Sequence, residues 1–199
     1  TICARPWTKP WKSEKFVCLK RTEEKADTLS ERFKMAYTVG IITLSDKGAL
    51  GQREDKSGPA IREILETDGR FEVSEQLLLS DDRMELEKEL VRLCDEKKLN
   101  LILTTGGTGL SPRDNAPEAT LAVAERQVPG IAEYMRVKSF QITPKAMLSR
   151  GVAAMRGRSL IINLPGSPKA VRENLGFILP ALGHGLDIML GLDGECGSN

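Results

Sequence analysis

Residues 101–118 read LILTTGGTGLSPRDNAPE, and the chain is best interpreted outward from this stretch. Its first five residues are apolar or β-branched, which is typical of a buried strand. The glycines of the central TGGTG allow positive φ angles and a close approach to a ligand, and consecutive N–H groups in such a loop can surround an anion. Pro117 and Glu118 are typical of the first turn of a helix. A strand, a glycine loop and a helix start in this order predict a phosphate- or nucleotide-binding loop.

The loop matches neither of the two best-known phosphate-binding patterns. No Gly-Lys-Ser/Thr follows, so it is not a P-loop. Read from Gly107 it is Gly-x-Gly-x-x-Pro, so Pro112 replaces the third glycine of a dinucleotide fingerprint. The glycine count alone fits a plain turn about as well as a ligand loop.

Composition predicts one domain with an extension rather than several domains. The chain has 199 residues, of which 40% are hydrophobic and 29% charged. Its net charge of +1 gives no reason to expect a nucleic-acid or membrane partner. There is no apolar run of transmembrane length and no signal-like N-terminus, so we expect a cytoplasmic protein.

Cysteine and histidine usage argues against metal and covalent chemistry based on these residues. The cysteines are Cys3, Cys18, Cys94 and Cys196, without a C-x-x-C pair, and His184 is the single histidine. A zinc site or a histidine-activated nucleophile is therefore not expected. Cys94 falls on an apolar helix face and is interpreted as a core residue, and the whole pattern favours a reducing compartment.

The sequence divides into three parts. Residues 1–34 are rich in charges and are interpreted as a flexible leader or linker, although Trp7 and Trp11 could instead dock onto the domain or a partner. Residues 35–192 form the expected domain, and residues 193–199 a C-terminal tail.

Strand and helix patterns alternate along the domain. Strands are expected at 37–44, 71–79, 99–104 and 159–164. Helices are expected at about 57–69, after Ser80 and Asp81, at 120–127, at 131–140, from 144, after the loop at 163–169, and at 180–190. Ser57 is expected to cap the first helix, and Ser80 or Asp81 the second. This alternation predicts an α/β fold: a three-layer α/β/α domain with a mostly parallel central sheet.

Polar residues follow four of the expected strands. They are Ser45 and Asp46, Ser80 and Asp81, the glycine loop with Asp114, and residues 163–167. Ligands of parallel α/β sheets bind beyond the carboxyl ends of the strands, so we expect these residues to converge on one cleft.

Charged residues at this edge suggest the chemistry of the cleft. Asp46, Asp81 and Asp114 are candidate ligands for Mg²⁺, which prefers one or two carboxylates together with substrate phosphates. Each aspartate alone is equally compatible with a helix cap or a turn. Arg113 and Arg150 are candidate partners for phosphate groups. Phosphoryl or nucleotidyl transfer fits this set, because it depends mainly on positioning and charge stabilisation.

Several short motifs, in order from residue 37 to about 191, resemble the MogA/MoaB family of molybdenum-cofactor proteins. The G domain of gephyrin and its plant counterpart are similar as well. The motifs are TLSD at 43–46, TTGGTG at 104–109, PRD at 112–114, PEAT at 117–120, LSR at 148–150 and INLPGSPKA at 162–170.

The resemblance implies molybdopterin adenylyltransferase activity, in which ATP and molybdopterin are the substrates. It also implies Mg²⁺, a homotrimer, and the molybdenum-insertion protein of the same pathway as a partner. Asp81 and Asp114 match the essential aspartates, with Asp46 near the nucleotide phosphates as a third metal ligand. By the same resemblance, Gly106, Gly107, Thr108 and Gly109 would bind phosphate and nucleotide, and Ser149, Arg150, Asn163, Pro165 and Gly166 match the pterin-phosphate side. The other residues that would bind the substrates are Ser45, Asp46, Thr105, Arg113, Glu118 and Ser167.

Two other functions remain open at this point. One is a molybdopterin-binding or scaffold module with little or no turnover. The other is a related domain of nicotinamide-nucleotide recycling proteins, which would require a long additional domain.

Overall fold

The computed structural model describes residues 36–192, and the interpretations of residues 1–34 and 193–199 lie outside this range. One six-stranded sheet runs through it in the order β2-β1-β3-β6-β5-β4. The strands are β1 (Tyr37–Leu44), β2 (Phe71–Leu79), β3 (Leu101–Thr105), β4 (Arg126–Gln127), β5 (Ala153–Arg156) and β6 (Ser159–Leu164). The pairs β1–β2, β1–β3 and β3–β6 are parallel, whereas β5 pairs antiparallel with both β4 and β6. The prediction of a mostly parallel sheet is confirmed.

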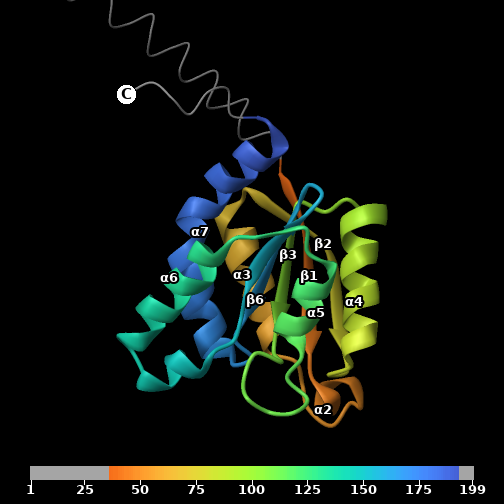
Figure 1. Ribbon diagram of the computed structural model, residues 1–199, viewed down its shortest axis with the longest axis vertical. Coiled ribbons are helices and arrows are strands. Elements are labelled where there is room, and N and C mark those ends of the chain that lie inside the picture. The colour runs from red at the N-terminus through yellow and green to blue at the C-terminus, as the bar shows by residue number, and fades with distance from the viewer. Residues whose placement is uncertain (1–35, 193–199) are drawn as a thin grey trace, which may run out of the picture. The chain divides into compact units, whose positions relative to one another are not determined.

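Helices cover both faces of this sheet (Figure 1). They are α2 (Asp46–Ala49), α3 (Ser57–Asp68), α4 (Arg83–Val91) with the π-helical turn η1 (Arg92–Glu96), α5 (Ala116–Val123), α6 (Pro129–Phe140), the 3-10 turn η2 (Pro144–Leu148) and α7 (Pro168–Leu190). Helices α3, α6 and α7 contribute to one hydrophobic cluster and α4 and α5 to the other, which gives the three layers. None of the helices in the described part of the chain is long and apolar enough to cross a membrane.

The central strands β1, β3 and β6 are buried along nearly their whole length because both of their faces are covered. In β1, Val39 and Ile41 belong to the cluster under α3 and α7, whereas Ile42 and Leu44 belong to the cluster under α4 and α5. Cys94 lies in the second cluster, as the sequence predicts, and burial raises the pKa of its thiol to about 11. A thiol with so high a pKa is protonated near neutrality and is a poor nucleophile.

The predicted strands 37–44, 71–79 and 159–164 match the structure at both ends. The strand predicted at 99–104 runs instead from Leu101 to Thr105. Two capping predictions are wrong. Ser57 is the first residue of α3, and the Asp55 carboxylate accepts the N–H groups of Ser57 and Gly58 instead, at 2.8 and 3.1 Å. Helix α4 is capped by Asp82, not by Ser80 or Asp81.

Three element boundaries also differ from the prediction. The helix expected at 120–127 ends at Val123, and its last predicted residues form β4. Strand β5, which the sequence pattern missed, pairs with β6 through a turn at Gly157, where φ is +53°. The helix expected after the loop at 163–169 and the last helix expected at 180–190 are one helix, α7, which begins at Pro168 and contains Pro180.

Candidate functional site

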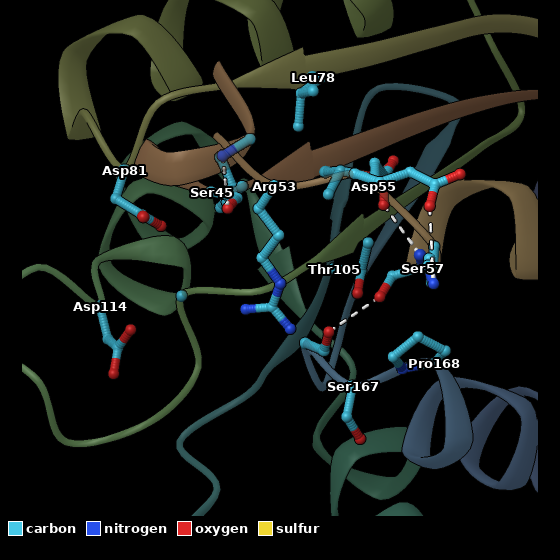
Figure 2. Close-up of a pocket in the computed structure, with 17 residues that line it drawn as sticks. Ser45, Arg53, Asp55, Ser57, Leu78, Asp81, Thr105, Asp114, Ser167 and Pro168 are labelled. Atoms are coloured by element: carbon cyan, nitrogen blue, oxygen red, sulfur yellow. Dashed lines mark hydrogen bonds and ion pairs between the residues drawn. The ribbon is translucent and has the colours of Figure 1, made fainter. Parts of the chain in front are cut away.

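A cleft of about 760 Å³ lies at the carboxyl edge of the parallel strands. Seven of the predicted site residues line it, from four separate loops: Ser45, Asp81, Thr105, Gly107, Asp114, Gly166 and Ser167. Figure 2 shows Asp81 and Asp114 on one side of this cleft and Thr105, Ser57 and Ser167 on the other. The convergence expected from the polar strand ends is therefore present.

The glycine loop takes a backbone course that requires glycine. Gly106 has a φ of +98°, and a Cβ atom there would lie 2.4 Å from the carbonyl oxygen of Leu44. A Cβ atom on Gly109 would lie 2.8 Å from a carboxylate oxygen of Asp114. These glycines let the loop pass directly against the end of β1 and beside the aspartate.

Arg150 braces this loop from the outside. Its Nε donates to the carbonyl of Gly109 at 2.7 Å, and its two terminal nitrogens donate to the carbonyl of Asp114 and to the Glu118 carboxylate. The other carboxylate oxygen of Glu118 is buried without a hydrogen-bond partner in the described structure. The three contacts tie both ends of the loop segment 109–114 to one side chain.

Asp46 and Asp81 connect the ends of β1 and β2 by reciprocal hydrogen bonds. The N–H of Asp46 donates to the Asp81 carboxylate at 2.9 Å, and the N–H of Asp81 donates to the Asp46 carboxylate at 3.0 Å. Ser45 adds a cap to α2, because its hydroxyl accepts the N–H of Gly48. Together these bonds position the Asp81 carboxylate at the rim of the cleft.

Arg113 pairs with Asp46 across this rim. Its Nε and Nη2 donate to the two oxygens of Asp46 at 3.0 and 2.6 Å. The Arg113 hydrogen bond holds the pKa of Asp46 below its usual value, and Asp46 in turn raises the pKa of Arg113. The two side chains, 57% and 40% exposed, form a solvated ion pair at the rim of the cleft.

Asp81 has the opposite shift. Burial raises its pKa, the N–H of Asp46 lowers it, and the charges of Asp46 and Asp114 raise it further. Nearby like charges of this kind favour a bound cation. Within residues 36–192, however, no group of three or more His, Cys, Asp or Glu side chains is arranged to hold a metal ion.

A second cavity, of about 280 Å³, is lined by residues that neighbour those of the cleft in sequence. Thr108 and Gly109 follow Gly107, and Asn163 and Pro165 precede Gly166, so the two cavities share the glycine loop and the loop after β6. Predicted residues lining it are Thr108, Gly109, Ser149, Asn163 and Pro165.

Asn163 is fixed at the base of this second cavity. Its amide nitrogen donates to the hydroxyls of Thr104 and Thr120, both at 2.9 Å, and its oxygen accepts the N–H of Val152 at 3.2 Å. All three contacts are internal, so the Asn163 side chain orients β3, α5 and the start of β5 relative to one another.

Five predicted site residues line neither of the two cavities: Asp46, Gly106, Arg113, Glu118 and Arg150. Asp46, Gly106 and Arg150 contact residues that line a cavity. Arg113 contacts Asp46, and Glu118 contacts Arg150. In the structure they position the site and are not part of its walls.

The sequence patterns did not indicate one whole wall of the cleft. Residues 53–57 line it with Arg53, Glu54, Asp55, Lys56 and Ser57. The Ser57 hydroxyl donates to the carbonyl of Gly166 at 2.8 Å, which connects this wall to the loop after β6. A signal was present, since the charged run REDK at 53–56 lies in the polar loop between the first strand and the helix expected from residue 57.

Comparison with known proteins agrees with this architecture. A family described as "Probable molybdopterin binding domain" matches residues 40–184. The molybdopterin adenylyltransferase of Helicobacter pylori strain J99 is 43% identical over 162 residues, which cover 77% of this chain and 88% of that protein. The molybdopterin adenylyltransferase of Escherichia coli K12 is 43% identical over 148 residues, with 73% and 75% covered.

Among solved structures, the molybdopterin biosynthesis enzyme MoaB from Thermus thermophilus is similar, with a TM-score of 0.74 and 52% identity. The match covers 78% of this chain and 97% of that one. The family match spans most of the chain and includes the glycine loop, Asp81, Asp114 and the loop after β6. This chain belongs to the MogA/MoaB family of molybdopterin-binding domains.

Proposed function

We propose that this protein is a molybdopterin adenylyltransferase, which transfers AMP from ATP to the terminal phosphate of molybdopterin. The observation that carries the proposal is a large cleft lined by the glycine loop and by the carboxylates of Asp81 and Asp114, joined through shared loops to a second cavity. Two relatives that are 43% identical to this chain are named molybdopterin adenylyltransferase.

The two cavities suit two substrates that must meet. We place the triphosphate of ATP in the larger cleft, against Thr105, Gly107 and the loop at Gly166. We place molybdopterin in the smaller cavity, beside Ser149 and Asn163. The reacting phosphates would then meet at the glycine loop, where backbone N–H groups and positive φ angles allow close contact.

The reaction needs positioning more than proton transfer. An oxygen of the terminal phosphate of molybdopterin forms a bond to the α-phosphorus of ATP, the bond to the bridging oxygen breaks, and pyrophosphate leaves with its electron pair. The attacking phosphate is already anionic, so no strong general base is required. Consistently, no cysteine or histidine lines the cleft in the described structure.

Asp81 and Asp114 both line the cleft, where they fit a Mg²⁺ ion that is also bound by substrate phosphates. The negative charge of Asp114 contributes to the raised pKa of Asp81, and a cation between the two carboxylates would relieve this repulsion. Bound there, Mg²⁺ would neutralise phosphate charge and stabilise the departing pyrophosphate. Asp46 would join as a third ligand only after Arg113 releases it.

We also propose that the enzyme works in the cytoplasm as a homotrimer, and that the molybdenum-insertion protein of the pathway receives its product. The support is the family membership. Sedimentation of the purified protein tests the trimer, and a monomer at high concentration would contradict it.

Pyrophosphate release tests the reaction. Purified protein is incubated with ATP and Mg²⁺, with and without molybdopterin. Release that requires molybdopterin is expected. Tight molybdopterin binding without any release would contradict adenylyl transfer and favour the binding-module alternative.

A further inference from the structure

Most of the positive charge around the cleft is already paired. Arg113 is bound to Asp46 through two hydrogen bonds. Lys56, which lines the cleft, lies 3.5 Å from Glu54 and its side chain is 68% exposed. Each of these two cations already has a carboxylate partner, which would compete with an anion bound in the cleft.

Arg150, the remaining cation near the glycine loop, is committed to the loop itself. Its guanidinium contacts Gly109, Asp114 and Glu118 and does not line either cavity. A polyphosphate in the cleft would thus face Asp81 and Asp114 without a matching cation from these residues.

Arg53 is the exception. Its backbone is held by a hydrogen bond from its N–H to the carbonyl of Lys47 at 3.1 Å. Its side chain runs from that loop into the middle of the cleft, with Asp81 and Asp114 on one side and Thr105 and Ser167 on the other (Figure 2). Its guanidinium makes no hydrogen bond or ion pair with any residue in the described range 36–192.

A guanidinium that enters a cleft from an anchored loop without a carboxylate partner suits a planar, two-point acceptor. Phosphate oxygens accept such paired hydrogen bonds, and the guanidinium keeps its charge at any physiological pH. Glu54, Asp55, Asp81 and Asp114 also line the cleft, and Lys56 is paired with Glu54. Of the two cations that line the cleft in the described range 36–192, Arg53 is therefore the one that makes no ion pair.

We propose that Arg53 binds a phosphate group of the substrate in this cleft. The inference rests on the proposed function, because it concerns the same cleft. Both ATP and molybdopterin carry phosphate, and the arms of the test separate the two sources.

The test compares equilibrium binding by calorimetry for wild type, Arg53→Ala, Arg53→Lys and Lys47→Ala. Lys47 is the matched control, since it is an exposed cation on the adjacent α2 that lines neither cavity. The ligands are ATP, adenosine and molybdopterin. Arg53→Ala is expected to weaken one phosphorylated ligand roughly 10- to 100-fold while adenosine binding is unchanged.

Loss for ATP identifies a nucleotide phosphate, and loss for molybdopterin identifies the pterin phosphate. Arg53→Lys should fall between wild type and Arg53→Ala, because lysine keeps the charge and loses the fork. Unchanged affinity of Arg53→Ala for both phosphorylated ligands, or an equal loss in Lys47→Ala, overturns the assignment.

The outcome is separable from that of the proposed reaction. If Arg53→Ala loses affinity for ATP but wild type never releases pyrophosphate, Arg53 is a phosphate-binding residue and adenylyl transfer is wrong. If pyrophosphate release is normal and the affinities are unchanged, adenylyl transfer stands and the role of Arg53 is wrong.

Discussion

Asp114 combines a structural and a chemical role at the end of the glycine loop. One of its carboxylate oxygens accepts the N–H of Ser111 at 2.9 Å, and the side chain lines the cleft. Asn can accept the same hydrogen bond but carries no charge for a magnesium ion. We therefore expect Asp114→Asn to fold like wild type and to lose roughly 100- to 1000-fold in kcat. Circular dichroism and pyrophosphate release measure the two properties, and normal turnover would contradict the metal assignment.

Gly106 illustrates how one backbone position fixes the loop. Alanine there would combine a positive φ with a Cβ atom 2.4 Å from a backbone oxygen, neither of which relaxes easily. Gly106→Ala should lower the free energy of unfolding by roughly 2 to 4 kcal/mol in urea titrations. Gly130→Ala is the control, because nothing lies within 4 Å of its Cβ position. A similar loss in both variants would show that the close contact is not the cause.

Among single residues, the sequence predicted the cleft position of those that lie at the ends of strands. Ser45, Asp81 and Thr105 line the cleft because the carboxyl ends of neighbouring parallel strands share one edge. Arg53 and Asp55 were missed because they lie in an irregular loop, where no periodicity indicates the direction of a side chain.

The start of α3 depends on Asp55 more than on the helix's own residues. Its carboxylate accepts from the N–H groups of Ser57 and Gly58 and from the Thr43 hydroxyl at 2.8 Å. Asp55→Ala leaves these donors without their partner and should destabilise the protein by roughly 1 to 2 kcal/mol.

Asp55→Asn should cost clearly less, because the amide oxygen keeps an acceptor in place. Ser57→Ala is the comparison, because the sequence predicted Ser57 as the cap of α3 and the structure does not show it in that role. It removes the bond to Gly166 but no cap of α3. If Ser57→Ala and not Asp55→Ala loosened the helix start in hydrogen exchange, the capping assignment would be wrong.

Two elements show where local patterns were insufficient. Pro180 indicates a helix start in sequence, yet α7 continues through it because Val171, Leu175, Ile178, Leu182 and Leu186 all pack into one cluster. Strand β5 is four residues long and two of them are only half-buried, so its pattern is too short to separate it from a loop. Tertiary packing and pairing with β6 decide both cases.

At the scale of the whole molecule, Glu75 links the outer strand of the sheet to the helical layer. It accepts two hydrogen bonds from Arg92, at 2.5 and 3.2 Å. Arg92 lowers the pKa of Glu75 from 4.5 to about 2. A lowered pKa in the folded state means that the contribution to stability is complete above about pH 4.5 and is lost as the pH falls through 2.

Glu75→Gln is therefore expected to lower the free energy of unfolding by about 1 kcal/mol at pH 7, a value reduced for solvent screening of a partly exposed pair. The difference from wild type should shrink below pH 4.5 and vanish near pH 2. Urea titrations across this range measure it, with Glu72→Gln on the exposed side of the same strand as the control. A difference that is constant with pH would contradict the ion-pair explanation.

The architecture itself was largely predictable from the alternation of strands and helices. The order β2-β1-β3-β6 brings the four strand ends to one edge, which is the reason that distant segments form one cleft. The walls that residues 53–57 and η2 contribute to the two cavities were not predictable, because these segments follow no strand or helix period.

The central claim is that the α-phosphate of ATP moves to molybdopterin. The most direct measurement uses ATP labelled with ³²P at the α-phosphate or at the γ-phosphate, with the pterin product separated by chromatography. We predict that α-label appears in the pterin product and that γ-label appears only in pyrophosphate. Label from the γ-phosphate in the pterin product, or no label from either position despite molybdopterin binding, would contradict adenylyl transfer.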